Sequence, residues 1–342
     1  MPGRVGYVYH EIYLRHETGH HPENKERLTA ILARLESDDL LQRLVAIPAR
    51  PAGEKEICLV HHAAMLDRIR RLAKSGGGYL DLDTLVSAAS YDAAVWAAGG
   101  TVAAVEAALT GDIDSAFALV RPPGHHATPT RSMGFCLINN VAIAAAWALA
   151  TDQAHRIAIV DLDVHHGNGT QEAFAKEPAV LYISLHQYPF YPGTGHWRDT
   201  GRGQGEGSCI NIPFPPCVGD VGYRQAFDTI VRPALRRFQP DLIMVSAGYD
   251  GHWADPLAAM LLSLSGYRYL ADALHDLAKS LCGGHLIYVL EGGYHLDVLS
   301  RGVATTIASL LQEPYPDTFG PAPEAETPVD DLLRHIAAYH GL

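Results

Sequence analysis

The sequence predicts an α/β protein whose parallel sheet is covered by helices on both faces. Two observations lead to this fold class. Short apolar or β-branched runs alternate with helical patterns along the chain, which indicates βαβ units. In addition, glycines and polar residues collect at the ends of four of the apolar runs, where sheets of this kind bind their ligands.

The order of the elements follows from these patterns. Strands are expected at residues 4–10, 115–120, 156–164, 179–186, 209–214, 241–250 and 285–294. Helices are expected at residues 22–37, 91–110, 138–150, 220–238, 266–282 and 296–312. The Pro-rich stretch 313–328 reads as an extended surface segment before a last helix. Without an internal repeat or linker, one domain is expected over 1–342, with a core at about 5–312 and a C-terminal extension at 313–342.

The composition is typical of a globular protein with a sizeable core. Hydrophobic residues make up 48% and charged residues 19% of the 342 residues. A formal net charge of −12 without a basic patch argues against a nucleic-acid binder. The five cysteines are irregularly spaced and form no CxxC motif, so neither a disulfide framework nor a structural zinc site is expected. No signal peptide or membrane-spanning segment is recognisable, and a cytoplasmic protein is expected.

Four strand ends carry the chemically unusual residues. They are RPPGHH (121–126), DLDVHHGN (161–168), SAGYD (246–250) and EGGY (291–294). One such coincidence would mean little, but four of them predict a single site assembled at one edge of the sheet.

A metal site is predicted in the second of these stretches. Asp161, Asp163 and His165 alternate, so on an extended backbone they point to one face. A lone Asp at a strand end is usually a cap, but two acids and a histidine at this spacing favour a zinc site with oxygen and nitrogen ligands. The third ligand must come from another strand end, where Asp250 is the best-placed acid. Asp161 lies deeper, and it either orients a histidine or helps to hold a monovalent cation.

The histidines after the Pro-Pro-Gly turn are candidates for acid–base chemistry. His125 and His126 lie in a constrained loop, and histidine titrates near neutral pH. Each needs a partner on its far nitrogen, for which Asp161 and Asn168 are candidates. By contrast, the pair at 61–62 is expected to be a solvated surface pair. In LEGGYH (290–295), the hydroxyl group of Tyr294 on its Gly-Gly turn can stabilise an oxyanion opposite the metal.

Seven stretches match the motifs of one enzyme family in the family's order. They are GHHPENKERL (19–28), RPPGHH (121–126), GFCLINN (134–140), DLDVHHGNGTQ (161–171), SLHQYPFYPGTG (184–195), SAGYDGHWADPL (246–257) and LEGGY (290–294). On these residues the chain resembles the zinc-dependent histone deacetylase superfamily, which includes class II-like bacterial deacetylases and acetylpolyamine amidohydrolases. The resemblance implies a three-layer α/β/α arginase-deacetylase fold around an eight-stranded parallel sheet.

The resemblance also implies the metals and the catalytic groups. One zinc ion per chain would be held by Asp163, His165 and Asp250. A structural potassium ion would lie at Asp161, Asp163, His165, Ser184 and Leu185, partly on backbone oxygens. His125 with Asp161, and His126 with Asn168, would flank the zinc-bound water, and Tyr294 would polarise the acyl carbonyl. Asn168 is typical of the class II branch. The substrate channel would be formed by Gly134, Phe135, Tyr191, Leu257 and Gly293, while Arg27 matches an arginine on the acetate exit path.

The expected function is hydrolysis of the amide of N-acetyl-lysine or related acyl-lysine side chains, with release of acetate. Acetylated polyamines are the rival substrates. The neutral Leu257 at the channel rim favours acyl-lysine peptides, whereas Asp81 or Asp83 at the mouth can bind either a substrate backbone or an amine. A two-metal ureohydrolase of the arginase type is disfavoured because SAGYDGH (246–252) offers one Asp where two are needed. The other alternative is a non-catalytic, metal-binding pseudo-deacetylase. No nucleic-acid or membrane partner is expected, and a homo-oligomer is possible.

Overall fold

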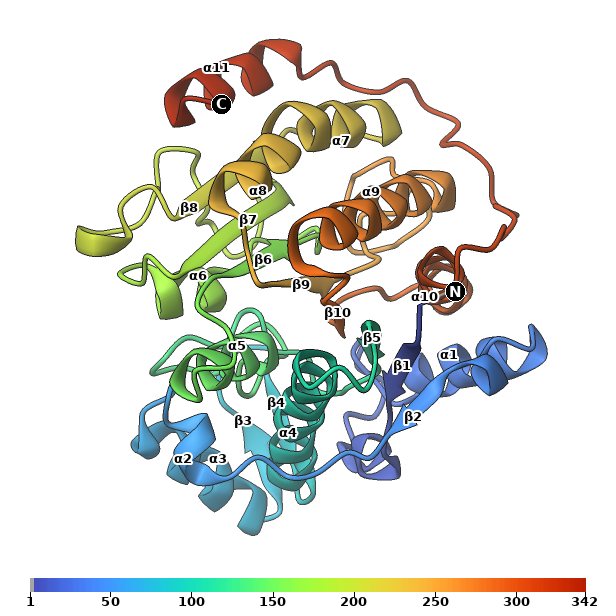
Figure 1. Ribbon diagram of the computed structural model, residues 1–342. Helices are drawn as coiled ribbons and strands as arrows, with labels where there is room; N and C mark the ends of the chain where they lie inside the picture. The colour runs from blue at the N-terminus through green and yellow to red at the C-terminus, as the bar shows by residue number, and fades with distance from the viewer. Residues whose placement is uncertain (1–2) are drawn as a thin grey trace.

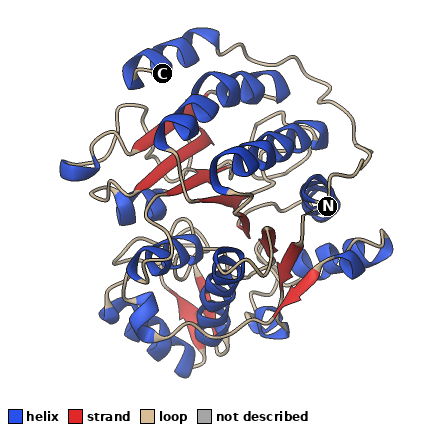
Figure 2. Cartoon of the chain, in the orientation of Figure 1, coloured by secondary structure: helices blue, strands red, loops and turns tan. Residues whose placement is uncertain are grey.

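The computed structural model describes residues 3–342 and contains an eight-stranded, fully parallel sheet (Figures 1 and 2). In spatial order the strands are β2 (Val45–Ile47), β1 (Val5–Val8), β5 (Ser115–Ala118), β10 (Leu286–Leu290), β9 (Leu242–Ala247), β6 (Ile157–Asp161), β7 (Val180–Gln187) and β8 (Cys209–Phe214). The five strands from β5 to β7 are buried at every position, which explains their near-continuous apolar sequences.

Helices cover both faces of the sheet, so the predicted three-layer α/β/α architecture is confirmed. On one face α4 (Ser90–Leu109) packs against α5 (Asn140–Ala150), with the short α6 (Asn168–Phe174) beside it (Figure 1). The other face is covered by α1 (Glu26–Ser37), α10 (Leu296–Leu310), α9 (Leu264–Cys282), α7 (Asp220–Ala226) and α8 (Arg232–Phe238). Short helical turns η1 (Glu11–Arg15), η2 (Leu41–Arg43) and η3 (Gly203–Gly205) complete the connections.

Several elements were not predicted, although the longest of them, a 12-residue helix over 63–74, has the apolar spacing of an amphipathic helix. Strand β2 has three residues and the side chain of Val45 is 45% exposed, so no apolar run marks it. The helices α2 (Glu54–Ile57) and α3 (Ala63–Lys74) were also not predicted. Beside them, the strands β3 (Gly77–Tyr79) and β4 (Leu85–Ser87) form a separate two-stranded hairpin.

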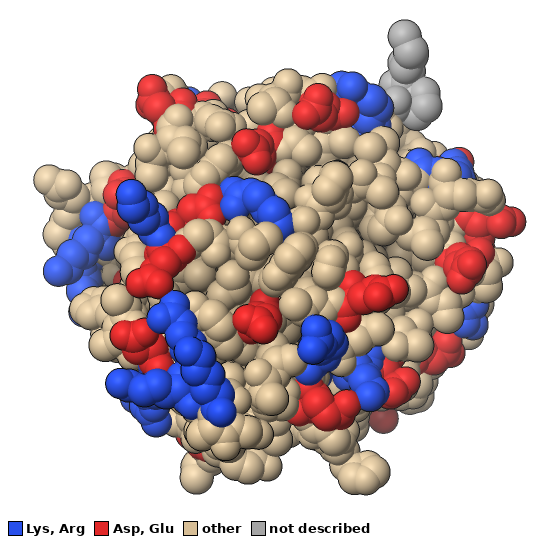
Figure 3. All heavy atoms as spheres, turned by 90° about the horizontal axis from the view of Figure 1, so that it is seen from below, with Lys and Arg blue, Asp and Glu red and all other residues tan. Residues whose placement is uncertain are grey.

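The helix predicted at 220–238 is one continuous helical segment, but a π-helical turn, η4 (Phe227–Val231), separates α7 from α8. The helix predicted at 22–37 begins only at Glu26, because residues 19–25 form turns and bends. The last helix, α11 (Asp330–His340), packs against α7 and η4 after the extended segment that the sequence predicts. Within residues 3–342, no helix is both long and apolar enough to cross a membrane. On the face drawn in Figure 3, acidic and basic side chains lie interspersed.

Candidate metal centre and active-site channel

After β6 the backbone turns, and aspartate side chains of the turn accept hydrogen bonds from backbone N–H groups two residues further on. The strand ends at Asp161, earlier than expected, and the backbone N–H of Asp163 donates to Asp161 Oδ1 at 3.2 Å. The N–H of His165 donates to Asp163 Oδ1 at 2.9 Å. The expectation of an extended strand through residue 164 is therefore wrong. Asx turns, rather than strand alternation, bring Asp163 and His165 together.

Three side chains converge beyond the carboxyl ends of β6 and β9. His165 Nδ1 lies 3.1 Å from Asp163 Oδ1 and 3.2 Å from Asp250 Oδ2, and the three potential ligand atoms lie within 4.8 Å of one another. Gly292 N donates to the other oxygen of Asp163, and Val164 N donates to Asp250 Oδ1. These backbone contacts fix both carboxylates while their remaining oxygens face the histidine.

This trio fits a divalent cation that accepts nitrogen and oxygen ligands. Asp250 Oδ2 is buried and, apart from its 3.2 Å contact with His165 Nδ1, has no partner within residues 3–342, which is costly unless a cation completes its contacts. Burial and the Asp163 carboxylate raise the pKa of Asp250 to about 6. For the side chains alone, burial opposes the charged form of His165, but Asp163 and Asp250 outweigh this and raise its pKa to about 10. The pKa of Asp250 is thus raised first by burial, whereas that of His165 is raised by the two carboxylates beside it.

The two adjacent histidines have the partners that the sequence suggested. His125 Nδ1 lies 3.2 Å from Asp161 Oδ2, and His126 Nδ1 lies 2.9 Å from Asn168 Oδ1. Burial opposes the charged form of His125, but Asp163, Asp161 and then Glu291 raise its pKa to about 10. For His126, burial and then the positive charges of His125 and His165 hold the pKa well below its usual value. The pKa values of these two neighbouring imidazoles are thus shifted in opposite directions.

Two residues that the sequence analysis missed hold the loop of this histidine pair. Glu291 Oε2 accepts hydrogen bonds from the backbone N–H groups of Gly124, at 2.7 Å, and His125, at 3.1 Å. His61 is buried, 1% exposed, and bridges Thr128 O, at 2.9 Å, and Asn139 N, at 2.8 Å. The expectation that the pair at 61–62 is solvated is therefore wrong for His61, since it replaces water as the partner of two buried backbone groups.

A cavity of about 230 Å³ leads to the metal-ligand trio. Its lining includes Asp83, His125, His126, Gly134, Phe135, Cys136, His165, Tyr191, Leu257 and Tyr294. The predicted wall residues Gly134 and Phe135 form a tight turn in which both have positive φ, +57° and +68°. A Cβ atom at Gly134 would lie 2.5 Å from the His126 ring, so the wall can approach this histidine only as glycine.

Tyr294 reaches the same cavity from the turn after β10. Asp255, which the sequence analysis did not single out, accepts hydrogen bonds from the backbone N–H groups of Tyr294, at 2.7 Å, and His295, at 3.0 Å. Arg27 is buried, donates to Gly293 O at 2.7 Å and places its guanidinium carbon 5.2 Å from the centre of the Tyr294 ring. Burial raises the pKa of Tyr294 well above its usual value, so its hydroxyl group keeps its proton.

The groups expected for potassium lie beside the trio. Ser184 of β7 is the register partner of Asp161 of β6, and Leu185 follows it in the strand. The Ser184 hydroxyl group lies 2.9 Å from His186 Nδ1. Potassium binding at this place stays a prediction.

Comparisons with known proteins agree with this geometry. The family model for the histone deacetylase domain matches residues 21–310. The chain belongs to the histone deacetylase family. A probable deacetylase from Archaeoglobus fulgidus is 41% identical over 86% of this chain and 82% of its own length. A histone deacetylase-like amidohydrolase from Pseudomonas aeruginosa is 39% identical, again over 86% and 82% of the two chains. The crystal structure of the HDA15 HD domain superimposes with a TM-score of 0.87 at 39% identity, covering 92% of this chain and 91% of that one.

Family membership confirms the resemblance and the arginase-deacetylase fold inferred from the motifs. As a histone deacetylase family member, the protein is a hydrolase that acts on amide bonds. The family as a whole implies a metal cofactor, for which Asp163, His165 and Asp250 are the candidate ligands.

Proposed function

We propose that this protein is a zinc-dependent deacylase that hydrolyses the amide of N-acetyl-lysine or related acyl-lysine side chains and releases acetate. The observation that carries the proposal is the convergence of Asp163, His165 and Asp250 beside two oppositely tuned histidines, at the inner end of a channel. When bound, zinc lowers the pKa of a water molecule and polarises a carbonyl group.

His126 is the base in this proposal. A neutral His126 donates from Nδ1 to Asn168 Oδ1, which leaves its Nε2 lone pair free to accept a proton from the attacking water. Because its pKa is held low, His126 returns that proton readily to the leaving lysine amine. His125 is held protonated by its carboxylate neighbours, and it stabilises negative charge that develops on the reacting carbonyl group.

Tyr294 is the second donor to that developing charge. Its hydroxyl group stays protonated at neutral pH, and Asp255 and Arg27 fix the turn that carries it. A donor that is positioned before the reaction stabilises an oxyanion without reorganising. The turn contacts therefore matter for catalysis, although neither residue needs to touch the substrate.

The channel supports an acyl-lysine substrate. Phe135 and Tyr191 line the cavity, and their rings suit the methylene stem of lysine, whose burial is worth about 0.8 kcal/mol per CH₂ group. Polyamines share this stem, so the rim must discriminate between them. Leu257 lies in the lining and carries no charge, while Asp83 also faces the cavity. Leu257 favours peptides, and Asp83 is the group through which a polyamine preference would arise.

The test is a substrate profile of the zinc-loaded protein over acyl-lysine peptides and N-acetylated polyamines. We expect peptides to be the better substrates. Leu257→Glu should raise kcat/KM for acetylpolyamines relative to peptides by about tenfold, as expected for a charge pair worth about 1–1.5 kcal/mol. A wild type that prefers acetylpolyamines would refute the rim argument, and Asp83→Asn would then identify the selecting acid. A zinc-loaded protein that cleaves neither class would support a non-catalytic, metal-binding role.

A further inference from the structure

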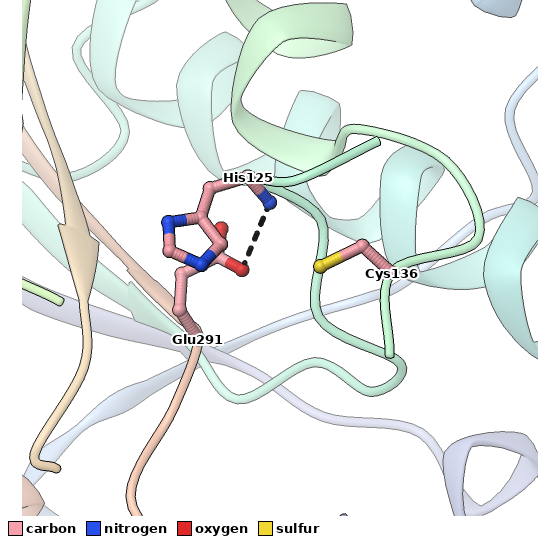
Figure 4. A group of neighbouring side chains, drawn as sticks. All are labelled: His125, Cys136 and Glu291. Atoms are coloured by element: carbon pink, nitrogen blue, oxygen red, sulfur yellow. Dashed lines mark hydrogen bonds between the residues drawn. The ribbon is translucent and has the colours of Figure 1, made fainter. Parts of the chain in front are cut away.

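A second group of potential metal ligands lies beside the first and includes a cysteine that the proposed reaction does not use. His125, Cys136 and Glu291 are all buried, and one ligand atom from each lies within 4.8 Å of the other two. Figure 4 shows the His125 ring next to the Glu291 carboxylate, with the Cys136 thiol pointing toward them from a neighbouring loop. Imidazole nitrogen, thiolate sulfur and carboxylate oxygen are the three donor types that bind zinc-like ions.

The Glu291 carboxylate is only half satisfied by the protein. Its Oε2 accepts the two backbone N–H groups of Gly124 and His125, whereas Oε1 has no hydrogen-bond partner among residues 3–342, although the residue is 0% exposed. A buried carboxylate oxygen without a partner is costly, and a cation at this point would remove that cost.

The thiol is held in place at the wall of the cavity. Reciprocal backbone hydrogen bonds between Met133 and Cys136, at 3.1 and 3.0 Å, close the turn over Gly134 and Phe135 and fix the direction of the Cys136 side chain. Cys136 is 0% exposed, and together with His125 it lines the cavity that opens toward the substrate mouth, which is the proposed route of entry for an ion.

We propose that His125, Cys136 and Glu291 form a second, inhibitory site for a thiophilic divalent cation such as Zn²⁺ or Cd²⁺ in excess over the resident metal. As the ion binds, the Cys136 thiol and the protonated His125 imidazole each lose a proton to solvent, so binding releases two protons. The bound ion takes up the His125 imidazole nitrogen as a ligand, so His125 is no longer free for catalysis, and the ion blocks the inner channel. This inhibitory consequence rests on the proposed function, whereas binding itself does not.

The experiment titrates the full-length, zinc-loaded protein with Cd²⁺. Bound cadmium and zinc are counted after equilibrium dialysis, and the thiolate-to-cadmium charge-transfer band is followed in the ultraviolet. We expect one Cd²⁺ per chain to bind with this band while the zinc is retained. Removing a residue that only hydrogen-bonds to a metal ligand typically lowers metal affinity by roughly 10–100-fold, and removing a ligand should cost at least as much. Cys136→Ser should therefore weaken Cd²⁺ binding at least tenfold, and it should lose the charge-transfer band because the sulfur is gone.

Two further variants make the result decisive. Glu291→Gln keeps the shape of the side chain but removes its charge, and it should weaken Cd²⁺ binding even if Cys136→Ser fails to fold. Cys58→Ser removes an exposed thiol elsewhere and should leave both the band and the stoichiometry unchanged. The proposal is overturned if the band survives in Cys136→Ser, or if each Cd²⁺ bound displaces a zinc ion. Failure of the proposed function would appear separately, as absent hydrolysis before any cadmium is added.

Discussion

Replacing Asn168 by Asp tests whether His126 is the catalytic base. Asn168 Oδ1 lies 2.9 Å from His126 Nδ1, so the new carboxylate would face the imidazole directly. At an effective dielectric constant of about 20, two charges about 4 Å apart interact by about 4 kcal/mol, or about 3 pKa units. Asn168 is only half-buried, and solvent screens part of this interaction, so we expect the pKa of His126 to rise by about 1–2 units.

The assay is the pH dependence of kcat/KM, which reports the pKa values of the free enzyme. A neutral base is lost as pH falls through its pKa, so a higher pKa for His126 moves the acidic limb upward by about 1–2 pH units. The control Gln42→Glu adds the same charge at an exposed position on η2 and should leave this limb in place. If kcat/KM of the Asn168 variant falls uniformly with no movement of the acidic limb, His126 is not the base.

Three other perturbations have defined outcomes. Asp250→Ala should remove most of the bound metal, as measured by elemental analysis, and two tightly held transition ions per wild-type chain would instead indicate a two-metal ureohydrolase site. Tyr294→Phe should lower kcat by roughly 10²–10³ with unchanged metal content, as for loss of one oxyanion donor, and wild-type turnover would contradict its role. Glu23 is buried against Arg121, and Arg121 Nε lies 2.6 Å from Glu23 Oε1. Burial opposes ionisation of Glu23, but Arg121 and His16 outweigh it and hold the pKa of Glu23 well below its ordinary 4.5. Glu23→Gln should therefore cost about 3–5 kcal/mol of unfolding free energy at pH 7. The ion pair contributes its full stability above the ordinary pKa of about 4.5 and loses it progressively as pH falls toward the lower pKa of the folded state. The deficit, measured by urea unfolding, should therefore shrink below about pH 4.5, and a constant deficit would exclude the ion pair as its cause.

The central strands and the main helices were predictable because their signals are local. An apolar run such as that of β9 must be buried on both faces, and the helical pattern that follows it leaves few alternatives to a parallel sheet. Elements with little apolar surface, such as β2, carry no such signal and were missed. The Asx turns after Asp161 were also missed, because alternating residues look the same whether the backbone is extended or turned.

The sequence by itself determined the fold class, the family and the identity of the polar groups at the strand ends. It did so because periodicity and short motifs are properties of neighbouring residues. Only the tertiary structure decided how these groups combine. The contact of His165 with Asp250 joins residues 85 positions apart, and that of Glu291 Oε2 with Gly124 N joins residues 167 positions apart. The proposed second cation site and the opposite pKa shifts of His125 and His126 arise from such contacts, since burial and Coulomb interactions depend on distance in space rather than along the chain.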